Sequence, residues 1–195
     1  MKLGPGREFD RLRAVARALG ERAPDLGDDC ALLPLDDSVL VLSTDSSVEN
    51  VHFRLDWIEP AEAGWRSAAS ALSDLAAEGA EPLGLLAALV VPDRASDEDV
   101  TAFMSGVGGA GAAAGAPVLG GDLSSGAEWS AAITVIGRSR APVTRAGARQ
   151  GDGLWVTGVL GGPRAALQAW RRGELPAPAA RRAFVRPEPR PATGQ

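Results

Sequence analysis

Carboxylates at the ends of predicted elements are the first candidates for chemistry in this chain. Asp29 precedes a short apolar run, Asp45 follows one, and Asp122 follows a glycine pair. Asp74 comes late in a predicted helix, on a face of small side chains. Taken singly, each of these aspartates is more often a turn or cap residue than a ligand. A shared oxygen-only site for magnesium carrying a nucleotide would use Asp29, Ser43, Thr44, Asp45, Asp74 and Asp122.

Scarce residue types exclude several other mechanisms. The only lysine is Lys2, so the chain has neither the lysine of a Walker-type phosphate loop nor the internal strand lysine of a protein-kinase fold. One histidine, His52, and one cysteine, Cys30, are too few for a zinc site within the chain and exclude an internal disulfide. A nucleophile with His52 as its base stays formally open. Chemistry therefore falls mainly to carboxylates, hydroxyls and arginines, which suit hard cations and phosphorylated ligands.

Three further features each have two interpretations. His52, between two apolar residues, is either a hydrogen-bonded core imidazole or a ligand contact. The turn at 120–122 offers backbone donors for a phosphate, although a plain loop is the commoner role of such a glycine pair. Arg145 is either a phosphate clamp or a solvated charge in a connector. None of the three decides a function by itself.

Charge and hydropathy exclude two broad classes of partner. The net charge is −5 and no basic stripe of the kind that binds nucleic acid is present, so we expect no nucleic-acid partner. Residues 1–19 lack the apolar region of a signal peptide, and no apolar run reaches the length of about eighteen residues that spans a bilayer. We therefore expect no membrane partner and a cytoplasmic protein.

The apolar periodicity predicts alternating helices and strands, which is typical of an α/β fold. Helical spacing covers residues 7–19, a stretch from Pro60 to Gly79, and a stretch that begins at a Ser96 cap. Strands are predicted at 30–33 and 39–42, joined as a hairpin, and at 83–91, 117–119 and 129–136. The run 106–115, almost entirely Gly and Ala, predicts close packing.

Composition changes after Ile136 and suggests a second unit. We divide the chain into an N-terminal domain at 1–138, a linker at 139–150 and the beginning of a C-terminal domain at 151–195. A strand at 154–157 and a helix begun by Pro163 are predicted in this last part. One strand and one or two helices cannot bury their own apolar faces, so we expect this unit to be incomplete.

Five motifs, in this order and spacing, resemble those of thiamine-monophosphate kinases. They are LGDDCALL (26–33), LSTDSSVENVHF (42–53), ALSDLAAEGAEP (71–82), LGGD (119–122) and TRAGARQGDGLWVTGVLGG (144–162). No single motif is specific, but the five together are. The resemblance extends to the superfamily of aminoimidazole ribonucleotide synthetase. It implies a PurM-like N-terminal domain, with a mixed sheet that carries helices on one face and pairs in a homodimer, followed by a truncated second α/β domain.

The resemblance also implies a reaction. It is the transfer of the γ-phosphoryl group of ATP to the phosphate of thiamine monophosphate, giving thiamine diphosphate. Several Mg²⁺ ions would be held by the ligand set named above, with ATP contacts at Gly121, Asp122 and Arg145 and a substrate contact at His52. The acceptor oxygen is already anionic, so we expect no protein residue to act as a catalytic acid or base.

Two departures from the family pattern lie beside these positions. Glu78 stands where a methionine is common, and Leu123 replaces a threonine. The family's later aspartate-bearing and acidic motifs have no counterpart here, so we expect weak or no kinase activity from the chain alone. Two alternatives stay open: another synthetase or maturation member of the superfamily that acts on a different acceptor, and a non-catalytic dimerisation fragment.

Overall fold

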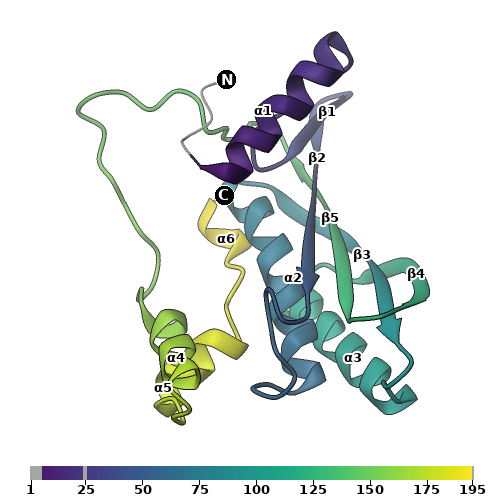
Figure 1. The fold of residues 1–195 in the computed structure, drawn as a ribbon. Coiled ribbons are helices and arrows are strands. Elements are labelled where there is room, and N and C mark those ends of the chain that lie inside the picture. Colours follow the sequence, from purple (N-terminus) through teal and green to yellow (C-terminus); the bar gives the residue numbers. More distant parts are fainter. Residues whose placement is uncertain (1–5, 24–25, 195) are drawn as a thin grey trace.

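A five-stranded mixed sheet with helices packed on one face forms the centre of the molecule (Figure 1). The computed structural model describes residues 6–23 and 26–194. The strand order is β1-β2-β5-β3-β4, in which β3 and β4 are parallel and all other neighbours are antiparallel. The strands are β1 (Ala31–Leu35), β2 (Ser38–Val48), β3 (Glu81–Pro92), β4 (Val118–Gly126) and β5 (Ser130–Ser139). The predicted α/β class with a mixed sheet is therefore confirmed.

The described chain has six α-helices and one short 3-10 helix. They are α1 (Arg7–Leu19), η1 (Gly20–Arg22), α2 (Pro60–Ala77), α3 (Asp97–Ala113), α4 (Gly162–Arg171), α5 (Pro178–Val185) and α6 (Pro191–Gly194). Helix α2 begins at a proline behind a capping box formed by Glu59 and Glu62. Helix α3 begins at the predicted Ser96 cap, which forms a capping box with Asp99.

Helices α2 and α3 cover the same face of the sheet and lie against each other (Figure 1). That face carries fully buried side chains such as Val41, Ile133 and Leu85. A Cβ at Gly106 would lie only 1.9 Å from the Ala61 carbonyl oxygen, so the close crossing of the two helices requires glycine there. The predicted close packing of the Gly/Ala run is confirmed.

The opposite face of the sheet is open. Leu33 and Leu35 of β1 and Leu86 of β3 lie on it, with exposed fractions of 54%, 53% and 36%. Helix α1 has the predicted bounds and an amphipathic pattern, but among the described elements it contacts only η1 and buries no residue. These leucines are therefore uncovered within the described chain.

Helices α4, α5 and α6 pack back onto the N-terminal part of the chain. The Arg181 guanidinium donates two hydrogen bonds of 2.7 Å to the Glu62 carboxylate at the start of α2. The Trp57 and Trp170 rings stack with their centroids 5.6 Å apart. The side chains of Phe184 and Val185 join the main hydrophobic core. These contacts place residues 162–194 beside α2.

Three boundary predictions were wrong. Strand β2 runs on to Val48, so Asp45 lies within a strand and not after one. Strand β4 continues through Gly120, Gly121 and Asp122, which therefore form no loop. The strand predicted at 154–157 is absent, and Leu154 and Trp155 are almost fully exposed. Strand assignment depends on a partner strand, which β5 and β3 provide in the first two cases and which the described chain does not provide for 154–157.

No helix in the described ranges is both long and apolar enough to cross a lipid bilayer.

Candidate functional site

Two carboxylate-hydroxyl pairs join β2 to α2. The Ser43 hydroxyl donates a hydrogen bond of 2.5 Å to Asp74, and the Ser70 hydroxyl donates one of 2.9 Å to Asp45. The alternation of β2 directs Ser43 and Asp45 towards the helices, on the same face as Val41. Ser70 and Asp74 lie four residues apart and so share one face of α2. The structure thus brings together three of the predicted ligands, Ser43, Asp45 and Asp74.

Asp74 is the predicted ligand whose pKa is raised. Burial raises the pKa of its carboxyl to about 6, the hydrogen bond from Ser43 opposes this rise, and the negative charges of Asp45 and Asp29 add to it. A desolvated carboxyl among other carboxylates is stabilised by a bound cation. The small residues around Asp74 leave it half-buried and not sealed in the core.

Asp29 lies beside the start of β1 and is paired with Arg145. The Arg145 guanidinium contacts both carboxylate oxygens, with Nε 3.1 Å from Oδ2. The backbone N–H of Arg145 donates to both oxygens of Asp28 at 3.2 Å. Asp29 also contributes to the raised pKa of Asp74, so the two carboxylates act on each other electrostatically. Arg145 therefore belongs to the same acidic region as the predicted ligands, although the residues between it and β5 form no regular element.

Glu78 is a member of this region that the sequence reasoning did not place there. Its side chain is buried, with 1% exposure, although it follows directly on α2. Burial raises the pKa of Glu78 to about 7, and the charge of Asp28 contributes further. An acidic residue inside a run of small residues at a helix end was the available signal.

The other two predicted ligands, Thr44 and Asp122, lie on the open face of the sheet. The Thr44 hydroxyl is 2.9 Å from that of Thr134, its partner on β5. Asp122 pairs with Ala88 and lies on β4, three strands from β2, or about 14 Å at the usual strand spacing. Within the single described chain, Asp122 is not brought together with Asp45 or Asp74.

Gly121 has a packing reason to be glycine. A Cβ there would lie 1.8 Å from the carbonyl oxygen of Ala87 on the neighbouring strand. Its small size is therefore explained by strand packing alone. A contact of Gly121 with a nucleotide stays a prediction.

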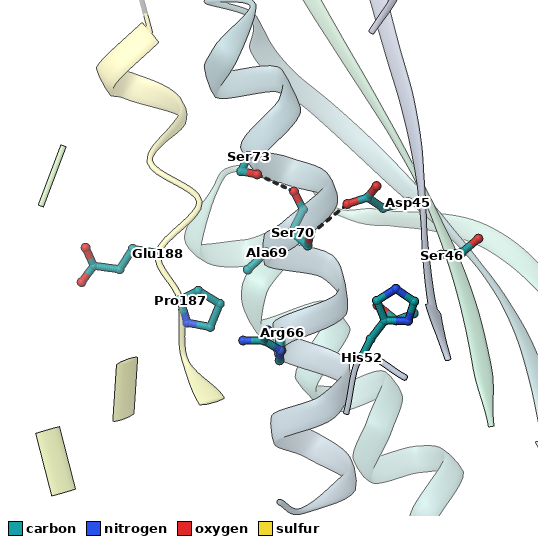
Figure 2. A pocket seen from close by; sticks show the side chains of 10 residues that line it. Asp45, Ser46, His52, Arg66, Ala69, Ser70, Ser73, Pro187 and Glu188 are labelled. Carbon is teal, nitrogen blue, oxygen red and sulfur yellow. Dashed lines mark hydrogen bonds between the residues drawn. The ribbon is translucent and has the colours of Figure 1, made fainter. Parts of the chain in front are cut away.

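His52 lines a cavity of about 440 Å³ that begins at the Asp45–Ser70 pair (Figure 2). It is exposed, and its Nδ1 accepts a hydrogen bond of 3.0 Å from the backbone N–H of Val48. This contact holds the ring and leaves Nε2 available to a ligand. The core interpretation of His52 was wrong, because its neighbour Phe53 is the buried residue and His52 is not.

Arg66 of α2 is a cationic residue in this cavity and was missed in the sequence. Figure 2 shows it between His52 and Pro187. It donates a hydrogen bond of 2.7 Å to the Phe184 carbonyl oxygen, and burial lowers its pKa. No described carboxylate forms an ion pair with it. Its position one turn before Ser70 was the available signal.

His52 and Arg66 also line a neighbouring cavity of about 710 Å³. Its other walls include the aromatic residues Trp57, Trp170 and Phe184. A ligand with an aromatic ring and an anionic group would find complementary surfaces across the two cavities.

Cys30 is a buried thiol. Its side chain is 6% exposed, and burial together with the neighbouring carboxylates raises its pKa to about 12. A thiol in this state is a poor nucleophile and a poor metal ligand.

Comparison with known proteins places this arrangement in a family. Residues 27–139, which include the complete sheet and helices α2 and α3, match the model of the AIR synthase related protein, N-terminal domain. The chain belongs to this family. The expected superfamily is thereby confirmed. The carboxylates of Asp29, Asp45 and Asp74 all lie within the matched residues of this AIR synthase related chain.

Curated members of the family share sequence with most of the chain. The thiamine-monophosphate kinase of Mycobacterium tuberculosis (strain H37Rv) is 35% identical over 190 residues, which cover 96% of this chain and 57% of that protein. The thiamine-monophosphate kinase of Halobacterium salinarum is 37% identical over 142 residues, 71% of this chain and 49% of that protein. The chain therefore spans about half the length of these relatives.

Solved structures agree with the sequence comparison. The structure of AaThiL complexed with AMPPCP and TMP has a TM-score of 0.90 and 30% identity, and the match covers 100% of this chain and 63% of that one. Thiamine monophosphate kinase from Aquifex aeolicus has a TM-score of 0.84 and 27% identity, covering 100% and 64% of the two chains. The fold of this AIR synthase related chain is thus that of these kinases.

Proposed function

We propose that this chain forms the ATP- and magnesium-binding part of a thiamine-monophosphate kinase. The observation that carries the proposal is the meeting of Ser43, Asp45 and Asp74, of which Asp45 lines a cavity together with His52 and Arg66. Its support from outside is the similarity to kinases of that name and to the complex with AMPPCP and TMP. Among members of one fold, function follows from such a site and not from the fold alone.

The oxygen-rich side of the site would hold Mg²⁺ and ATP. The residues fit a hard cation, because carboxylates and hydroxyls are its preferred ligands and Asp74 is desolvated among other negative charges. We assign Asp29, Ser43, Asp45 and Asp74 to the ions, with Thr44 and Asp122 contributing from the open face. Arg145 would bind a nucleotide phosphate, with Gly121 beside it. Bound magnesium would neutralise phosphate charge.

The cavity side would hold thiamine monophosphate. His52 offers Nε2 and Arg66 its guanidinium to the phosphate, while Trp57 and Trp170 offer apolar walls to the rings. In the reaction, a phosphate oxygen of thiamine monophosphate attacks the γ-phosphorus of ATP, a new P–O bond forms, and the bond to the β-phosphate breaks to release ADP. These residues act by holding two polyanions in line, so no protein group needs to remove a proton.

A second domain and a second copy of the chain complete our proposal. Residues 1–138 would be the N-terminal domain, 139–150 a linker and 151–195 the start of the C-terminal domain, in which the exposed Leu154, Trp155 and Val156 would pair with further strands. The open sheet face, with its exposed leucines, would pair with the same face of a second copy. Thr44 and Asp122 lie on that face, which supports a site completed by a homodimer. An ATP-dependent reaction of this kind belongs in the cytoplasm.

Ligand-dependent melting tests the substrate assignment. With Mg²⁺ and AMPPCP present, thiamine monophosphate should raise the Tm of the chain more than thiamine does, because thiamine lacks the phosphate that His52 and Arg66 would bind. Equal shifts from both compounds, or a larger shift from an unrelated phosphate acceptor, would favour a different member of the superfamily.

A further inference from the structure

Three carboxylates meet where the loop before β1 covers the end of α2. One oxygen from each of Asp28, Asp29 and Glu78 lies within 4.8 Å of the others. Asp28 and Asp29 are half-buried, and Glu78 is buried. The loop and the helix end are thus held together despite three like charges at one point.

Glu78 is the unusual member of this group. Its side chain is 1% exposed, and its Oε2 is buried with no hydrogen-bond partner in the described residues. A buried carboxylate oxygen without a partner is costly, because water solvates it well and the protein interior does not. A bound cation would compensate this oxygen, and so would a proton shared with the Asp28 carboxyl beside it.

The backbone leaves Glu78 little freedom to avoid this position. Its N–H donates to the Asp74 carbonyl oxygen at 3.1 Å, which continues the α2 pattern. Its carbonyl oxygen accepts a hydrogen bond of 3.1 Å from the N–H of Val143. Both backbone polar groups of Glu78 are therefore hydrogen-bonded, and its side chain stays under the Asp28–Asp29 loop.

The local charges do not balance. When all three carboxylates are ionised, as ligands of a cation are, they carry a charge of −3, and Arg145, which contacts Asp28 and Asp29, contributes +1. The remaining charge of −2 equals that of one divalent cation in magnitude. Arg145 does not block such an ion, because each carboxylate oxygen keeps a second lone pair when it accepts one hydrogen bond.

We propose that Asp28, Asp29 and Glu78 form a divalent-cation site in which the buried Glu78 supplies one of the ligands. The ligands are all oxygens, which suits Mg²⁺ or Mn²⁺. Asp29 is also a ligand in our proposed function, so the inference rests on that proposal for this one residue. Asp28 and Glu78 are ligands only in the present inference. The bound ion fixes the loop before β1 to the end of α2.

The test counts Mn²⁺ ions by electron paramagnetic resonance in the absence of nucleotide and thiamine compounds. We compare the wild-type chain with Glu78→Gln and Glu78→Met, and with Glu81→Gln as a control for loss of an exposed carboxylate. The wild type and Glu81→Gln should bind one more Mn²⁺ than the two Glu78 variants, or bind it at least about tenfold more tightly. Equal Mn²⁺ binding by all four proteins would overturn the proposal.

Melting measurements keep the test valid if a substitution changes folding. In EDTA, Glu78→Met should melt at or above the wild-type temperature, because the buried carboxylate is gone. Added Mn²⁺ should raise the Tm of the wild type more than that of Glu78→Met. An equal Mn²⁺-induced shift in both would mean that Glu78 is only a buried protonated acid, which contradicts the proposal.

Asp45→Asn separates this inference from the proposed function. That variant should keep the Mn²⁺ ion that depends on Glu78, because Asp45 is not among its three ligands. If no protein binds nucleotide and the Glu78-dependent ion remains, the proposed function fails and the cation site stands. If nucleotide binds and all Glu78 variants bind Mn²⁺ equally, the cation site fails alone.

Discussion

The Ser43 hydroxyl on β2 donates a hydrogen bond of 2.5 Å to the Asp74 carboxylate on α2, across 31 residues of sequence. Four residues before Asp74, Ser70 makes the corresponding contact with Asp45 of β2. These two hydrogen bonds join β2 to α2, and they place the carboxylates of Asp45 and Asp74 close together between the sheet and the helix. A site for a charged ligand is thus built into the main contact between the two layers.

Stability should depend on pH through the buried carboxyls. The pKa of Glu78 in the folded chain is raised from 4.5 to about 7, so the folded state holds its proton more tightly than the unfolded state does. Its stabilising contribution is present below about pH 4.5 and is lost as pH rises towards 7. Asp74, raised to about 6, acts in the same direction. In EDTA, the free energy of unfolding of Glu78→Gln should fall less between about pH 5 and pH 7.5 than that of the wild type. Parallel curves in urea titrations would contradict this.

Arg145→Gln should weaken nucleotide binding more than it weakens the fold. The ion pair with Asp29 is half-exposed, so its loss should cost only ~0.5–1 kcal/mol of stability. Loss of a phosphate contact should raise the Kd for Mg²⁺-AMPPCP by about tenfold. Arg140→Gln is the matched control, because Arg140 pairs with Asp37 at 3.6 Å with both side chains exposed. The same loss of affinity in both variants would show that general charge, not Arg145, is responsible.

His52→Gln should weaken the binding of thiamine monophosphate but not the binding of the nucleotide. Removing the imidazole takes away the free Nε2 that we assign to the phosphate of thiamine monophosphate. Calorimetry should show affinity for thiamine monophosphate reduced by about tenfold and affinity for Mg²⁺-AMPPCP unchanged. A variant that binds thiamine monophosphate as tightly as the wild type would remove His52 from the site.

Leu86→Asp should produce a monomer. Leu86 lies on the open face of β3, where a buried charge would oppose pairing with a second copy. Light scattering should show a dimer for the wild type and for the control Leu154→Asp, whose side chain is fully exposed in the segment after the sheet. A monomeric wild type at micromolar concentration would contradict the dimer proposal.

Local signals in the sequence were sufficient for helices α1, α2 and α3. Helix α1 has the predicted bounds because its apolar residues keep helical spacing up to Gly20, and α3 begins directly after Ser96 because a capping box satisfies its first N–H groups. The order of the strands could not be predicted in this way. The strand at 154–157 was predicted from apolar residues that have no partner in the described chain, whereas Asp45 and Asp122 lie in strands because distant segments pair with them.

Some residues of the site could likewise be predicted from the sequence, and others could not. The predicted ligands Ser43, Asp45 and Asp74 were found because their motifs resemble a family, and the structure brings them together. Arg66 and Glu78 were missed, because only the packing of α5 places the half-buried Arg66 beside a cavity, and only the loop before β1 covers Glu78. Their charges in a helix of small residues were the only signal in the sequence.

Metal-dependent nucleotide binding tests the central claim most directly. Calorimetry with AMPPCP should show binding to the wild-type chain in Mg²⁺ and none in EDTA, because the carboxylates of β2 and α2 would otherwise repel the phosphates. Asp45→Asn should abolish this binding, and Asp37→Asn, which changes an exposed carboxylate at the β1–β2 turn, should retain it. Binding that is equal in Mg²⁺ and EDTA, or that survives Asp45→Asn unchanged, would contradict our account of the site.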